Sequence, residues 1–206
     1  MPPAFSGVEK TRIRKVLLDA GHRLFTTQGL RKTSLEDIVA PAGIAKSSFY
    51  LFFDSKEALY LELMMARMSA VKKKVIDGAL LAEPSTREGL RRFLHASIDE
   101  LATDPLYGRL MTHPDELEAV ARKLDLSRLT AEPDNPATAL TTFIGQRQSS
   151  GDLIPAEPAV ITGVLQAVLL LPMHAARLSD PRRYPEILDL LIDIVAAGLT
   201  RREGTN

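Results

Sequence analysis

The stretch that decides the fold is residues 33–59, TSLEDIVAPAGIAKSSFYLFFDSKEAL. Its first apolar residues, Leu35 and Ile38, recur at the spacing of one face of a helix. Pro41 and Gly43 end this helix, because proline clashes with a continuing helix and glycine accepts the left-handed backbone of a tight turn. The stretch therefore predicts a short helix followed by a sharp turn.

A second, very short helix is predicted at residues 44–52, and a third begins at Ser55. Two short helices around a glycine turn form the helix-turn-helix pattern, whose second helix enters the major groove of DNA. Thr33 and Glu36 have the spacing of a capping box, which predicts that Thr33 caps the first helix. The same spacing begins at Asp54 and predicts a cap for the third helix.

This stretch resembles the N-terminal domain of the TetR/AcrR family of transcriptional regulators. Residues 43–59, GIAKSSFYLFFDSKEAL, carry the resemblance, together with Phe25, Gly29 and Thr33. The resemblance covers about the first 60 residues, and beyond them it extends only to length and helical layout. It implies an all-α fold with a helix-turn-helix DNA-binding domain at residues 1–60 and a helical effector-binding and dimerisation domain at residues 61–206.

Three positions depart from the family's pattern. Ala45 stands where serine or threonine is usual, so a helix cap and a potential DNA contact are lost. Leu51 replaces a frequent histidine and offers an apolar contact to a thymine methyl group. Pro41 replaces a helix former and shortens the first helix of the motif.

With the second helix in the major groove, its early residues face base edges and its flanks face phosphates. Lys46 is the only strong cation there and has the reach for a phosphate or for guanine N7 and O6. By resemblance, the Tyr50 hydroxyl donates to a phosphate. The predicted DNA-binding residues are Thr33, Ala45, Lys46, Ser47, Ser48, Tyr50, Leu51, Phe52 and Lys56.

The charge distribution has the sign that DNA binding requires, although the net charge of the whole chain is zero. Residues 1–60 hold nine Lys or Arg and six Asp or Glu, a net charge of +3, and residues 61–206 hold 17 and 20, a net charge of −3. The chain contains no cysteine, which excludes disulfides, thiolate metal sites and a cysteine nucleophile. Neither a signal peptide nor a membrane span is expected, which favours a cytoplasmic location.

The rest of the chain is predicted to be helical. The first helix is expected at residues 9–28, ended by Gly29. Further helices are expected at about 55–78, 87–103, 106–111, 114–126, 136–149, 157–178 and 184–200. Pro172 should kink the helix that contains it. The final helix is apolar on more than one side, so the last two helices are expected to form a four-helix bundle in a homodimer.

The C-terminal part is expected to hold a pocket for a small apolar or amphipathic effector. Its candidate lining residues are Phe93, His95, Tyr107, Leu110, Met111, His113, Phe143, Gln146, Met173 and His174. No metal-ligand spacing accompanies the histidines, and neither a cofactor nor a catalytic residue is predicted.

The sequence thus predicts a ligand-responsive transcriptional regulator, most simply a repressor that binds a palindromic operator in double-stranded DNA as a homodimer and is released by its effector. Two alternatives remain. An enzyme on a helical scaffold would lack a recognisable nucleophile elbow, phosphate loop or metal site. A helical interaction module that keeps a degenerate DNA motif is favoured by Ala45 and Leu51.

Overall fold

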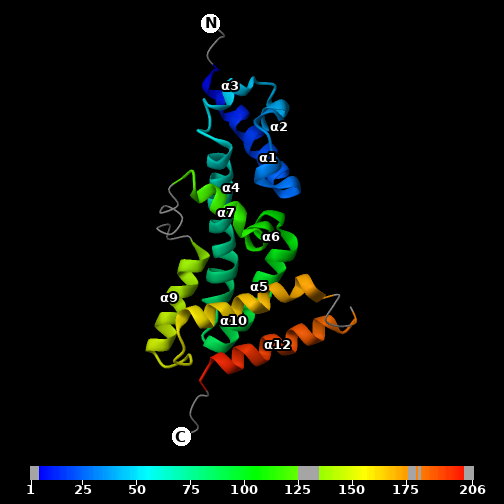
Figure 1. Ribbon diagram of the computed structural model, residues 1–206. Helices are drawn as coiled ribbons and strands as arrows, with labels where there is room; N and C mark the ends of the chain where they lie inside the picture. The colour runs from blue at the N-terminus through cyan, green and yellow to red at the C-terminus, as the bar shows by residue number, and fades with distance from the viewer. Residues whose placement is uncertain (1–4, 125–134, 176–179, 181, 202–206) are drawn as a thin grey trace. The chain divides into compact units, whose positions relative to one another are not determined.

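The computed structural model describes residues 5–124, 135–175, 180 and 182–201, and within these ranges the chain is helical (Figure 1). The one bridge between extended residues that the described ranges contain pairs Leu153 with Thr200. The all-α prediction is therefore confirmed. Contacts divide the chain into two compact units. The first unit comprises Met1–Arg67 and Asp104–Thr130, and the second comprises Met68–Thr103 and Ala131–Asn206.

The first unit begins with α1 (Gly7–Lys32), which starts at a capping box that the sequence reading did not identify. The Ser6 side chain accepts a hydrogen bond from the Glu9 amide, and the Glu9 carboxylate accepts one from the Ser6 amide. The regular helix is interrupted at Gly29, where φ is 85° and ψ is 166°. This backbone region is open almost only to glycine, so the predicted helix end at Gly29 is confirmed, although one short turn follows it.

The helix-turn-helix motif consists of α2 (Leu35–Val39), the 3-10 turn η1 (Ala40–Ala42) and α3 (Lys46–Phe49). Pro41 lies in η1, and Gly43 has a left-handed φ of 64°, which confirms the predicted stop and turn. The second helix is shorter than expected, with four α-helical residues in place of the predicted range 44–52.

Both predicted capping residues are wrong by one position. Ser34 caps α2, because its Oγ accepts the Asp37 amide at 3.1 Å. Ser55 caps α4 (Lys56–Val71), because its Oγ accepts the Ala58 amide at 3.0 Å. In each case a hydroxyl residue lies next to the predicted one, and sequence spacing alone does not decide which of the two adopts the extended cap conformation.

The first unit is completed by α6 (Pro105–Thr112) and α7 (Pro114–Ala121), which pack on α1. This grouping differs from the predicted domains, residues 1–60 and 61–206, because residues 104–124 pack with the N-terminal helices. The core of this unit is built from aromatic and aliphatic side chains, whereas Leu24 and Leu35 are only half-buried. Its buried members include Ile13, Leu17, Phe25, Leu30, Ile38, Phe49, Phe53, Leu59, Tyr60, Met64, Leu106 and Val120.

The second unit begins within α4, which continues directly into the π-helical segment η2 (Lys72–Leu80), so the predicted long helix is confirmed as one helical run. The other elements are α5 (Thr86–Thr103), α9 (Pro136–Ser149), α10 (Pro158–Leu170), η3 (Leu171–His174) and α12 (Tyr184–Leu199). Pro172 lies in η3, where the α-helix gives way to a 3-10 turn, as its missing amide requires. The buried hydrophobic side chains of α5, η2, α9, α10 and α12 are aliphatic apart from Phe93 and Phe143.

Candidate nucleic-acid interface

Most of the predicted DNA-contacting residues lie on α3 and the turn after it. Tyr50 and Leu51 are 55% and 67% exposed, and the Lys46 side chain is 53% exposed. Beneath them Phe49 and Phe53 are buried with their ring centroids 5.7 Å apart. Aromatic packing thus anchors the short helix to the core, while the side chains of Lys46 and Ser47 stay exposed.

The remaining predicted contact residues of this region fall into two groups. Ala45 and Ser47 are exposed, while Ser48 and Phe52 are half-buried. The Phe52 ring lies 6.1 Å from that of Phe5. Ala45 occupies the N-cap position of α3 without a side-chain hydrogen bond, as its missing hydroxyl predicts.

Lys46 is not isolated on this surface. Its Nζ donates a 2.8 Å hydrogen bond to Oε1 of Glu36, which lies on the first turn of α2. The hydrogen bond from Lys46 lowers the pKa of the Glu36 carboxyl and correspondingly raises the pKa of Lys46. Glu36 was not among the predicted contact residues, because ten positions separate it from Lys46 in the sequence.

The Thr33 hydroxyl is buried, whereas a phosphate contact through it would require it to be exposed. The residue is 1% exposed, and its Oγ1 donates to the Gly29 carbonyl at 2.8 Å. The hydroxyl therefore closes the end of α1 instead of facing solvent.

The Lys56 side chain also makes hydrogen bonds within the first unit. Its Nζ donates to the carbonyl oxygens of Leu30 at 2.9 Å and Thr33 at 2.7 Å. These carbonyls lie at the C-terminal end of α1, where the helix dipole favours a cation. Lys56 thus holds the end of α1 against the start of α4.

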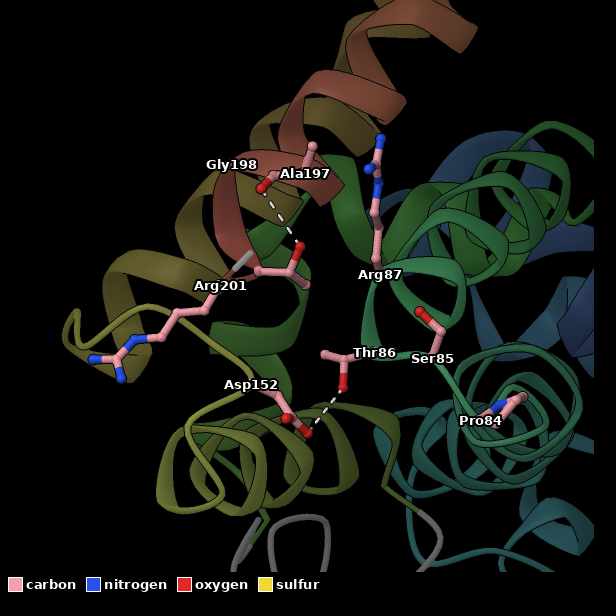
Figure 2. Close-up of a pocket in the computed structure, with 9 residues that line it drawn as sticks. Pro84, Ser85, Thr86, Arg87, Asp152, Ala197, Gly198 and Arg201 are labelled. Carbon is pink, nitrogen blue, oxygen red and sulfur yellow. Dashed lines mark hydrogen bonds between the residues drawn. The ribbon is translucent and has the colours of Figure 1, made fainter. Parts of the chain in front are cut away.

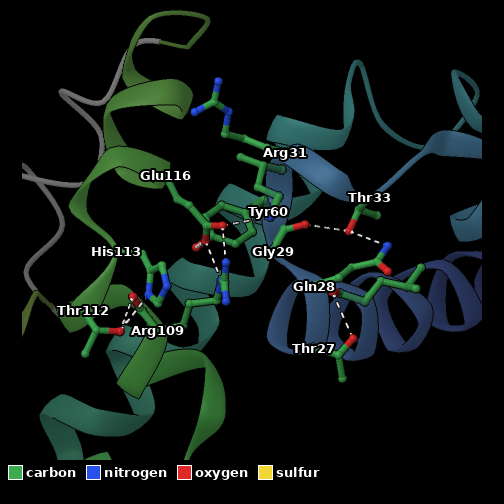
Figure 3. A network of polar contacts seen from close by, with 12 residues as sticks. Thr27, Gln28, Gly29, Arg31, Thr33, Tyr60, Arg109, Thr112, His113 and Glu116 are labelled. Atoms are coloured by element: carbon green, nitrogen blue, oxygen red, sulfur yellow. Dashed lines mark hydrogen bonds and ion pairs between the residues drawn. The ribbon is translucent and has the colours of Figure 1, made fainter. Parts of the chain in front are cut away.

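A buried polar network also contacts this end of α1 (Figure 3). Glu116 on α7 accepts hydrogen bonds from the Leu30 amide at 3.1 Å and the Tyr60 hydroxyl at 3.2 Å. Arg109 on α6 contacts the same carboxylate in a bidentate pair, with Nε at 2.9 Å and Nη2 at 2.7 Å. The Glu116 side chain is 5% exposed, and an added Cβ at Gly29 would lie 2.5 Å from its Oε1.

The protonation of this network follows from its geometry. Burial acts to raise the pKa of Glu116, but the hydrogen bonds from Arg109 and the Leu30 amide outweigh it and hold the pKa below its usual range. Burial and the adjacent Glu116 carboxylate raise the pKa of Tyr60. The network is therefore a carboxylate held by donors only, which is a stable arrangement for a buried charge.

The comparisons with known proteins concern first the N-terminal part. The profile described as "Bacterial regulatory proteins, tetR family" matches residues 17–63. The N-terminal domain is therefore of the TetR-family type. It is similar to the HTH-type transcriptional repressor KstR2 of Rhodococcus jostii (strain RHA1), with 35% identity over 48% of this chain and 49% of that relative. An HTH-type transcriptional regulator, YdgC of Bacillus subtilis (strain 168), is 42% identical over 32% of this chain and 33% of its own length.

These matches span about half and a third of the two relatives, so they bear on the DNA-binding end of TetR-family proteins. The comparison with solved structures covers most of the chain. The TetR-family regulator HI0893 of Haemophilus influenzae RD has a TM-score of 0.67 at 19% identity over 93% of this chain and 98% of its own. The ketosteroid transcriptional regulator KstR2 of Mycobacterium tuberculosis has a TM-score of 0.64 at 20% identity, over 92% and 95%. The predicted family and TetR-type fold are confirmed, and the relatives' names support DNA-binding transcriptional regulation.

The ten predicted effector-contacting residues are divided between the two units. Tyr107 and His113 belong to the first unit, together with Leu110 and Met111, whose side chains lie outside what the structure describes. The other six belong to the second unit: Phe93 and Phe143 are buried in its core, His95 is 3.8 Å from Asp189, and Gln146, Met173 and His174 are exposed.

The second unit contains a cavity of about 770 Å³ where α5 begins and α12 ends (Figure 2). Polar and charged side chains dominate its lining, and Thr86 donates to Asp152 across it. Arg87 and Arg201 also line it, whereas none of the predicted effector residues does. In the described ranges, no helix has the length and apolar content that a membrane span needs, and no three acidic or histidine side chains are placed to hold a metal ion.

Proposed function

We propose that this protein is a transcriptional repressor that binds a palindromic operator as a homodimer and is released by a small amphipathic effector. The observation that carries the proposal is the exposed set Lys46, Ser47, Tyr50 and Leu51 on a short helix and the turn after it in a TetR-family domain. Exposed cationic, hydroxyl and apolar groups are the side chains that contact phosphates, base edges and thymine methyl groups. A cytoplasmic location accompanies this proposal.

Dimerisation is supported by apolar side chains that α10 and α12 leave in solvent. On α12 they recur three and four residues apart, which places them on one stripe of the helix. The exposed residues are Val160, Val164, Ile187, Leu190 and Ile194. A continuous apolar surface on two neighbouring helices is the surface that a two-fold related copy covers in a four-helix bundle.

A dimer would place two recognition helices one helical turn apart on DNA, roughly 34–36 Å. An effector that binds better to a conformer with another spacing would lower the population of the DNA-competent form. A coupling free energy of about 1–3 kcal/mol is enough for a 5- to 150-fold change in affinity. The polar cavity of the second unit favours an effector with hydrogen-bonding or anionic groups as well as apolar surface.

The experiment that tests the function is selection of binding sites from a random pool of duplex DNA, followed by a salt titration of the enriched site. A palindrome should be enriched, and Lys46→Ala should weaken binding to it while the protein stays folded. Affinity for the site should fall steeply with salt, because phosphate contacts release counterions. A folded protein that enriches no sequence even at low salt would refute the proposal and favour a helical interaction module.

A further inference from the structure

The ion pair between Glu36 and Lys46 has no evident role in stability. Its two side chains are 62% and 53% exposed, and an ion pair this open to water adds little to the free energy of folding. A carboxylate on a DNA-facing surface also repels phosphates. Glu36 nevertheless lies within one hydrogen bond of the cation predicted to enter the groove.

The geometry of the pair matches that of a base pair. The Lys46 ammonium and the Glu36 carboxylate present a donor and an acceptor 2.8 Å apart. In the major groove, guanine O6 and cytosine N4 present an acceptor and a donor. These two atoms are hydrogen-bonded to each other in the base pair, so they are also about 2.9 Å apart. The ammonium can therefore face O6 while the carboxylate faces N4, with the ion pair intact.

The donor count favours G·C over A·T. An ammonium has three N–H donors, and one of those of Lys46 is used by Glu36. Two remain, and guanine offers two neighbouring acceptors, O6 and N7. In an A·T pair the ammonium would face a single acceptor, either thymine O4 or adenine N7, because the N6 donor of adenine lies between them. The carboxylate keeps free lone pairs for the amino group in either case.

We infer that Glu36 and Lys46 act as one unit that reads a single G·C base pair in each half-site, Lys46 donating to guanine and Glu36 accepting from cytosine N4. The inference rests on the proposed DNA-binding function and adds Glu36 on α2 to the specificity-determining residues. The lowered pKa of the Glu36 carboxyl keeps it ionised, and hence an acceptor only, at neutral pH.

The test compares binding-site selection by the wild type, Glu36→Gln and Glu62→Gln. Glu62 is a matched control, because it forms an exposed ion pair with Arg14 in the same unit, with side chains 39% and 44% exposed. The wild type and Glu62→Gln should both prefer G·C at one position of each half-site by about 5- to 150-fold. Glutamine carries both a donor and an acceptor, so Glu36→Gln should reduce this preference to about twofold or less.

The affinity of Glu36→Gln for DNA of unrelated sequence should rise, since a negative charge is removed from the surface. Lys46→Gln and the double variant complete a cycle: if the pair acts as a unit, the double variant loses no more G·C preference than either single variant. A Glu36→Gln profile that keeps the G·C preference would overturn the inference and leave Glu36 as a repulsive neighbour only. Failure of the wild type to enrich any site would instead refute the proposed function, and the inference with it.

Discussion

The end of α1 offers the sharpest test of how the DNA-binding unit is held together, through the substitution Gly29→Ala. Gly29 combines two demands. Its φ of 85° with ψ of 166° is a region that residues with a Cβ rarely enter. An added Cβ would also lie 2.1 Å from Nη2 of Arg109 and 2.5 Å from Oε1 of Glu116. Alanine must therefore strain the backbone and displace the buried ion pair.

The two contributions can be given magnitudes. Backbone strain in such a region costs about 1–3 kcal/mol. Displacing Arg109 and Glu116 weakens charge-assisted hydrogen bonds that contribute about 1.5–3 kcal/mol each. Together we expect Gly29→Ala to lower the free energy of unfolding by roughly 3–5 kcal/mol. That is a large share of the about 5–15 kcal/mol that stabilises an ordinary domain.

Gly43→Ala is the matched control. Gly43 also has a positive φ, 64°, but nothing lies within 4 Å of the position of its Cβ. Only the left-handed backbone penalty applies there, about 1–2 kcal/mol. Urea unfolding followed by circular dichroism, with amide exchange at Leu30 as a local probe, would measure both. An Arg109→Ala background should reduce the cost of Gly29→Ala, because the nearest clash is gone. Equal costs for the two glycine substitutions would refute this account.

Three further outcomes are expected. The pKa of Glu116 is lower in the folded chain than its ordinary value of 4.5. The carboxylate therefore contributes to stability above pH 4.5, and this contribution is lost as the pH falls through the pKa of the folded state. In urea titrations at a series of pH values, Glu116→Gln should lose less stability than the wild type as the pH is lowered. Lys56→Met leaves carbonyls at the end of α1 without a donor and should cost about 1.5–3 kcal/mol in urea unfolding, whereas Lys46→Met should cost under about 0.5 kcal/mol. Leu190→Glu on α12 should convert a dimer to a monomer in light scattering, whereas Val8→Glu, which places the same charge at a still more exposed apolar residue of α1, should not; a Leu190→Glu protein that stays dimeric would place the interface elsewhere.

The sequence predicted the features that depend on neighbouring residues. Pro41 and Gly43 determined the turn between α2 and α3, because their backbone restrictions are local. Pro172 likewise marked the change from α10 to η3. The caps at Ser34 and Ser55 were missed by one residue, since adjacent residues of similar chemistry compete for the same amides.

What the sequence did not predict depends on contacts between distant residues. Glu116 accepts a hydrogen bond from the Leu30 amide, which lies 86 positions away in the sequence. In the sequence Glu116 is one of two acidic residues after Pro114, which suggests only a favourable first turn of α7. The signal that could have found it is Gly29: an unpaired amide after a helix end must find an acceptor, and a buried carboxylate is a strong one.

This network changes how Thr33 and Lys56 are to be understood. The Thr33 hydroxyl is bound to the Gly29 carbonyl, and the Lys56 ammonium is bound to the carbonyls of Leu30 and Thr33. With Glu116 on the Leu30 amide, the few residues between Gly29 and Thr33 are held by both an anion and a cation. Ser34 follows at once and caps α2, which carries Glu36. These contacts therefore fix where α2 begins, and the backbone amides at its start are the groups that we expect to meet a phosphate.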